Sequence, residues 1–211
     1  MARTISTKLA VEGEAQYKQA IAACNQQLST LKSQLALTES EFRGQANSME
    51  ALRAKGQALQ GMYDQQVSKI EQIKKALENC EKAQQEYARR VAEAEDNIYA
   101  YETSLERLKN TAGDTTEEQK KLEEGLSQWK RELAEATAGQ EAAERGAQNW
   151  QRQLNYAGVE LNELSDRIQQ NSQYLEEAEN SADGCADSID EYGKATKDAG
   201  DASEEFGEES V

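Results

Sequence analysis

Apolar side chains recur at alternating steps of three and four residues along most of this chain. If residues whose numbers are multiples of seven are called position a, and residues three further on position d, then all leucines except Leu9 and Leu37 occupy these two positions. A repeat of 3.5 residues held over many turns winds α-helices around one another in a left-handed supercoil. The pattern therefore predicts an all-α, elongated coiled coil.

The predicted core consists of the large apolar residues at a and d. Trp129 and Trp150 occupy d, so we interpret them as core residues and not as a base-stacking or ligand platform. Polar residues at these positions, such as Gln66, Gln84, Gln140 and Asn171, are expected to set register and partner number. The core residues predicted are Leu28, Leu31, Leu35, Leu52, Leu59, Ile70, Ile73, Leu77, Val91, Ile98, Leu105, Leu108, Leu122, Leu126, Trp129, Leu133, Trp150, Leu154, Leu161, Leu164, Ile168 and Leu175.

Glycine and capping residues divide the predicted helices. Gly44 is followed by Asn47 and Glu50, which resemble a capping box, so a break is expected near 44–47. Gly113 and Asp114 lie among further capping residues and predict a turn at 112–115. The expected helices are therefore about 14–111, with the possible break, and 115–178.

The stretches on either side of this turn have equal length, which favours an antiparallel helical hairpin. The large d residues Tyr87 and Trp150 alternate with alanines, and an antiparallel partner offers a small residue to each large one. A turn centred on Gly113 would place Cys80 near Ala147. However, the heptad phase passes through Gly113 unchanged, as a continuous helix also requires. The number of strands is left open, because isoleucine at a favours dimers and leucine there dilutes that preference.

The two ends of the chain differ from the heptad region at 14–178. Residues 1–13 are rich in Thr, Ile and Val, so an extended N-terminal arm is expected. Residues 179–211 contain eleven acidic side chains against Lys194 and Lys197, and we interpret them as a flexible acidic linker. Ile189, Tyr192 and Phe206 leave room for a short helix that forms with a partner.

The composition argues against chemistry in this segment. Histidine is absent, which removes the commonest general base and imidazole ligand. The three cysteines are far apart and lack metal-binding spacing. Paired carboxylates such as Glu123 and Glu124 point in different directions on a helix. We therefore expect no enzyme activity, catalytic residue, cofactor, metal or small-molecule substrate.

The formal net charge of -16 repels phosphate backbones, so no direct nucleic-acid binding is expected for this segment. No apolar run approaches the ~20 residues of a membrane span, and no signal peptide is recognisable. A cytoplasmic protein is the expectation.

Several segments, taken in order, resemble the start of tail tape measure proteins from phages and prophages of Gram-positive bacteria. The likeness covers nearly the whole chain, although each motif alone is weakly specific because coiled coils imitate one another. The segments are residues 1–14 (MARTISTKLAVEGE), Tyr17–Ile21, Ser40–Gly44, Ser48–Lys55, Asn149–Asn155 and Asp190–Gly200.

This resemblance implies a multicopy helical filament inside the tail tube whose length dictates tube length, and which leaves the tube at genome ejection. It implies self-association, tail tube and tail assembly proteins as partners, and a passage from host cytoplasm to virion. A continuous helix of 211 residues would reach only about 320 Å, which is short for the family. We therefore expect the chain to be an N-terminal fragment of such a protein or an incomplete gene product.

Two other functions remain open. The chain could be a cytoplasmic coiled-coil scaffold or adaptor that binds partner proteins through its acidic tail. Alternatively, it could be the stalk of a hydrolase whose catalytic domain follows Val211.

Overall fold

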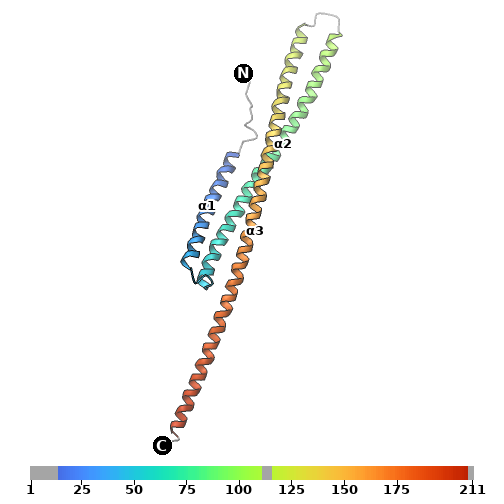
Figure 1. The fold of residues 1–211 in the computed structure, drawn as a ribbon. Coiled ribbons are helices and arrows are strands. Elements are labelled where there is room, and N and C mark those ends of the chain that lie inside the picture. Colours follow the sequence, from blue (N-terminus) through green and yellow to red (C-terminus); the bar gives the residue numbers. More distant parts are fainter. Residues whose placement is uncertain (1–13, 111–115, 209–211) are drawn as a thin grey trace. The chain divides into compact units, whose positions relative to one another are not determined.

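The computed structural model describes residues 14–110 and 116–208, and every regular element within them is an α-helix. The helices are α1 (Glu14–Glu41), α2 (Met49–Lys109) and α3 (Thr116–Glu208), shown in Figure 1. This confirms the predicted all-α fold. The predicted N-terminal arm at 1–13 and the turn at 112–115 lie outside the described residues.

Charged residues at the adjoining ends of α2 and α3 suit the helix dipoles. Arg107 and Lys109 occupy the last turn of α2, and Glu117 and Glu118 occupy the first turn of α3. The observed ends at Lys109 and Thr116 lie within two residues of those predicted from the capping pattern.

The chain divides into two compact units, and each contains a stretch of all three helices. Within the described residues, unit 1 comprises 14–26 of α1, 65–109 of α2 and 116–160 of α3, while unit 2 comprises 27–41, 49–64 and 161–208.

In unit 1, α2 and α3 lie side by side and run antiparallel (Figure 1). Tyr101 lies against Gly125, and Cys80 lies against Gly146, so residue numbers fall along α2 as they rise along α3. The predicted helical hairpin is therefore confirmed. Its register differs by one residue from the expected proximity of Cys80 and Ala147.

In unit 2, all three helices contribute to one hydrophobic cluster. Leu28 and Leu35 of α1 meet Leu59 and Met62 of α2 and Leu164 of α3. The side chain of Leu31 packs against the backbone at Gly61. Because α1 folds back onto α2, α2 must bury two faces in this unit.

The predicted break between α1 and α2 is present. Gly44 has a φ of 99°, a conformation that glycine adopts without the steric penalty of a Cβ. Ser48 caps α2, because its Oγ accepts a hydrogen bond of 3.3 Å from the backbone N–H of Ala51. The N-cap is thus Ser48 and not the predicted Asn47, and Ala51 at the third helical position cannot complete a capping box.

The predicted end of helix at residue 178 is wrong, because α3 continues to Glu208. We expected a linker from the loss of leucine, but a helical backbone needs only residues compatible with helix, and this segment contains no proline. The side chains described between 179 and 194 are all exposed. The segment thus forms helix without burying those side chains within the chain.

Candidate functional site

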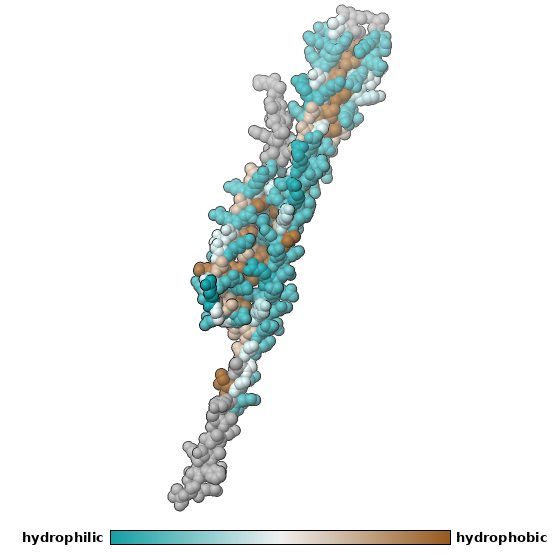
Figure 2. Space-filling model, in the orientation of Figure 1, coloured by the Kyte–Doolittle hydropathy of each residue, from teal (hydrophilic) through white to brown (hydrophobic). Residues whose placement is uncertain are grey.

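The antiparallel contact between α2 and α3 is the feature of each unit with the most specific geometry. Figure 2 shows hydrophilic residues over much of the visible surface and a hydrophobic seam between the two helices at the upper end of unit 1. None of the predicted core residues is exposed. Eight of them are buried, namely Leu28, Leu35, Leu52, Leu59, Ile70, Ile73, Trp150 and Leu164, and the other fourteen are half-buried.

In unit 1, two tyrosine rings of α2 fit against glycines of α3. A Cβ added at Gly139 would lie 2.3 Å from the ring of Tyr87, and one added at Gly125 would lie 2.4 Å from the ring of Tyr101. Such distances are far below van der Waals contact, so any larger residue would displace the ring. The spacing of fourteen residues on both helices is two heptads, and it lets both rings fit in a single register.

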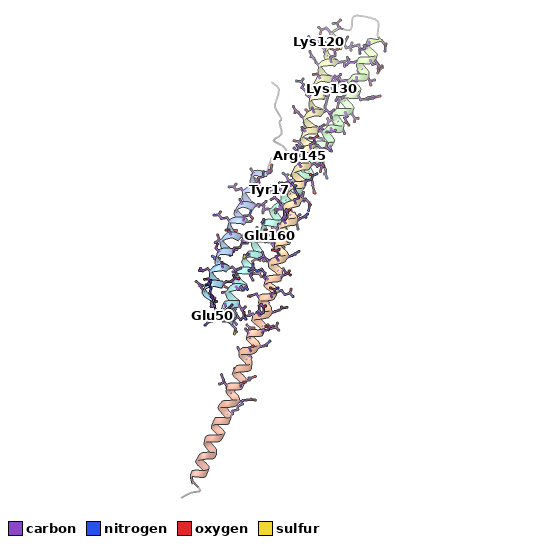
Figure 3. The ribbon with its side chains drawn as sticks, in the orientation of Figure 1. Tyr17, Glu50, Lys120, Lys130, Arg145 and Glu160 are labelled. Carbon is purple, nitrogen blue, oxygen red and sulfur yellow. The ribbon has the colours of Figure 1, made fainter. Side chains whose placement is uncertain are left out.

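A buried glutamine reinforces this register in unit 1. Gln66 is only 1% exposed, and its Nε2 donates to the carbonyl oxygen of Ala157 at 2.8 Å and to Glu160 Oε2 at 2.9 Å. Lys69 Nζ lies 3.2 Å from the same Glu160 oxygen; Figure 3 labels Glu160 on α3. A shift of one heptad would separate Gln66 from Glu160 and Lys69 from its partner, so the sliding of one helix along the other is opposed.

In unit 2, a buried asparagine of α3 likewise forms a hydrogen bond with α2. Asn171 Nδ2 donates to the carbonyl oxygen of Leu52 at 2.8 Å, while its Oδ1 is buried and has no partner among the described residues. A Cβ added at Gly56 would lie 3.1 Å from Nδ2, so glycine there leaves room for the amide. The prediction that polar core residues set register agrees with both contacts.

Ion pairs flank the interface, and most are solvent-exposed. In unit 1, Arg90 pairs with Glu132 and lies 5.6 Å from the centroid of the Tyr87 ring. Lys130, labelled in Figure 3, lies 3.0 Å from Glu102 across the helix pair. Exposed ion pairs contribute about 0–1 kcal/mol each to stability. These pairs therefore favour one orientation of α2 against α3 but add little to the stability of the helix pair.

Two cysteines are buried as free thiols within the described residues. Burial raises the pKa of the Cys80 thiol, and the negative charges of Glu14 and Glu81 raise it further. Because the thiolate is the reactive form, Cys80 is a poor nucleophile and metal ligand. Its contact with Gly146 makes it a packing residue of the interface.

A second buried stripe on α2 lies outside the a and d positions and was not predicted. Ala51, Met62 and Ala76 are buried although none occupies a or d. Met62 shares a cluster with Leu28 and Leu35, so in unit 2 this stripe faces α1. The signal that could have revealed it is the recurrence of apolar residues beside the main stripe, which marks a helix with two neighbours.

No group of three or more metal-ligating side chains occurs in the part of the chain that the structure describes. Among the described helices, none is long and apolar enough to cross a membrane. Glu123 and Glu124, considered above as a carboxylate pair, are both exposed. The described residues therefore offer a helix–helix interface.

No protein-family model, curated protein or solved structure matches the chain.

Proposed function

We propose that this chain is a structural spacer with a fixed internal register, and that it acts as the N-terminal coiled-coil part of a phage tail tape measure protein. In that role it would contribute to tail length during assembly and move out of the tube at genome ejection. Its partners would be further copies of itself and tail proteins. It would carry out no chemistry.

The observation that carries the proposal is the register of α2 against α3. Tyr87 and Tyr101 fit only where α3 has glycine, and Gln66 bonds only where Ala157 and Glu160 are opposite. A protein that measures or spaces must not slide along itself, and these contacts oppose sliding. The ordered sequence motifs that resemble tape measure proteins supply the particular role.

A paired deletion tests this role. Removing residues 81–94 of α2 together with the facing residues 132–145 of α3 keeps the a and d phase in both helices. It shortens the hairpin by about 21 Å, at about 1.5 Å per residue. Electron microscopy of tails from the virus that encodes the chain should then show tubes shorter by about 21 Å, or by about twice that if the helices are laid end to end in the tail.

The matched control is Gly158→Ala, which changes no length and meets no neighbour within 4 Å. Normal tail length with the control and shortened tails with the deletion support a ruler. Tails of unchanged length with the deletion would contradict it.

A scaffold or adaptor is the second candidate, and the exposed side chains of α3 between 179 and 194 favour it. A scaffold needs its binding surface but not its length. Unchanged tail length after the paired deletion, combined with loss of tail assembly after removal of residues 179–211, would favour this alternative.

A further inference from the structure

One stretch of α3 in unit 1 differs in charge from the rest of the chain. Residues 145–159 contain Arg145 and Arg152 and no carboxylate, whereas Glu144 and Glu160 adjoin the two ends of the stretch. Figure 3 labels Arg145 at its start and Glu160 just beyond its end. The chain as a whole carries a formal net charge of -16. The stretch is therefore a local basic surface on an acidic protein.

The outer face of this stretch also carries large side chains that are open to solvent. Tyr156 is 73% exposed, Val159 is 57% exposed, and Arg152 is exposed as well. The three residues follow one another at steps of four and three, so they adjoin on one face of the helix. They occupy positions c and f, which point away from the a and d contact with α2. The face is thus an exposed patch of one cationic, one aromatic and one aliphatic side chain.

The guanidinium of Arg152 is available to an anion from another molecule. Arg89, an exposed arginine of α2 in the same unit, pairs with Glu86 at 2.7 Å and with Glu93 at 3.3 Å. The residues three and four positions from Arg152 on its helix are three amides and a tyrosine. Within the described part of the chain, Arg152 accordingly forms no ion pair.

Comparison with Tyr99 of α2 shows what distinguishes Tyr156. Tyr99 is 73% exposed too, but the carboxylates of Glu95 and Asp96 lie one turn before it. Single exposed apolar side chains are normal on protein surfaces. Tyr156 differs because a second apolar side chain and an arginine adjoin it. Tyrosine and arginine are also among the residues most enriched at the energetic centres of protein interfaces.

We infer that the face formed by Arg152, Tyr156 and Val159 is a docking surface for an acidic segment of a partner protein. A carboxylate of the partner pairs with the Arg152 guanidinium, and an apolar side chain beside that carboxylate covers Tyr156 and Val159. Nucleic acid fits this face less well. Two arginines neutralise few phosphates, and the remaining charge of the chain repels a phosphate backbone.

The negative charge of the chain does not prevent an acidic segment from docking here. Along α3, the nearest carboxylates to Arg152 are those of Glu144 and Glu160, each eight residues away. At about 1.5 Å per residue this separation is about 12 Å. Charges are screened over about 8 Å at physiological ionic strength, so at this face the attraction to Arg152 exceeds the repulsion from those two carboxylates.

Fluorescence anisotropy of the full chain, with a labelled helical peptide of glutamate, leucine and alanine as the probe, tests the inference. We expect saturable binding that weakens as salt is raised, because salt screens the pairing with Arg152. Tyr156→Ala and Arg152→Glu should each raise the Kd by about tenfold or more. Tyr99→Ala and Arg89→Glu make the same changes at exposed positions of α2, and they should bind the peptide as the natural chain does. Far-UV circular dichroism checks that the helices remain.

Three results would overturn the inference. The first is equal binding of the peptide by Arg152→Glu and Arg89→Glu. The second is binding of a labelled single-stranded oligonucleotide that Arg152→Glu abolishes, which would assign the face to nucleic acid. The third is self-association in sedimentation velocity that Tyr156→Ala abolishes, which would make a second copy the occupant. The tail-length role stands or falls separately, because these substitutions leave the contacts that set the register of α2 and α3 in place.

Discussion

Glycines 125, 139 and 146 are the residues on which the fit between the helices depends most. Each lies opposite a larger side chain of α2, and a Cβ there would meet that side chain at 2.4, 2.3 and 3.1 Å respectively. From sequence we predicted that large core residues would face small ones. We did not predict these glycines, because a heptad analysis ranks positions by apolarity and glycine has no side chain to rank.

Gly139→Ala should destabilise the chain. The new methyl group would collide with the Tyr87 ring, and overpacking of this kind costs about 1–3 kcal/mol, less the helix propensity gained. Gly158→Ala is the control, since it meets nothing within 4 Å and should stabilise by up to about 1 kcal/mol. Urea unfolding followed by circular dichroism measures both, and equal effects would show that the Tyr87 contact is absent.

Because the thiol of Cys80 is buried, the free energy of unfolding is expected to change with pH in the alkaline range. Its pKa is raised in the folded chain, so the folded state holds the proton more tightly than the unfolded state does. This stability is fully present below about pH 8.5, the pKa of an unperturbed thiol, and is lost as pH rises through the folded pKa. Unfolding free energies measured from pH 7 to pH 10 should decline less steeply for Cys80→Ala than for the natural chain. Parallel declines would contradict the burial of the thiol.

At the scale of elements, α2 has two neighbours in unit 2 and α3 continues beyond its partner. The break after Gly44 was predictable, because a glycine followed by capping residues is a local signal. The folding back of α1 onto α2 was not predictable, because its signal in the sequence is a weak second apolar stripe on α2 that includes Met62. The end of α3 was predicted wrongly because the loss of leucine was interpreted as the end of the helix. Loss of leucine indicates that a segment buries few side chains, and a helical backbone can continue without such burial.

Gly44→Ala should weaken the connection between α1 and α2. No atom lies within 4 Å of the added Cβ, so the cost comes from the backbone and not from a clash. Gly44 has a φ of 99°, and a left-handed conformation costs residues other than glycine about 1–2 kcal/mol. Gly44→Asn should cost less, since asparagine tolerates positive φ. Thermal unfolding compares the three chains. An alanine variant as stable as the natural chain would mean that this turn has another conformation.

For the whole molecule, sequence periodicity predicted a coiled coil but could not choose between a hairpin and a continuous helix. The a and d phase is the same on both sides of Gly113, so the two arrangements have identical patterns. Contacts decide the matter: Tyr101 meets Gly125, and Tyr87 meets Gly139, within one chain. Fold and core residues were therefore accessible from sequence, whereas the polar and glycine contacts that set register needed coordinates.

Disulfide formation between Cys80 and a thiol introduced by Gly146→Cys tests the antiparallel hairpin most directly. The Sγ of Cys80 lies 3.1 Å from the Cβ position at residue 146. This is close to the distance between the sulfur of one cysteine and the Cβ of the other in a disulfide. Gly158→Cys serves as the control, because no side chain approaches that position. Oxidised at high dilution, the Gly146→Cys chain should form this disulfide within monomers, and Gly158→Cys should not. A disulfide at position 146 found only between chains, or none at all, would contradict the hairpin.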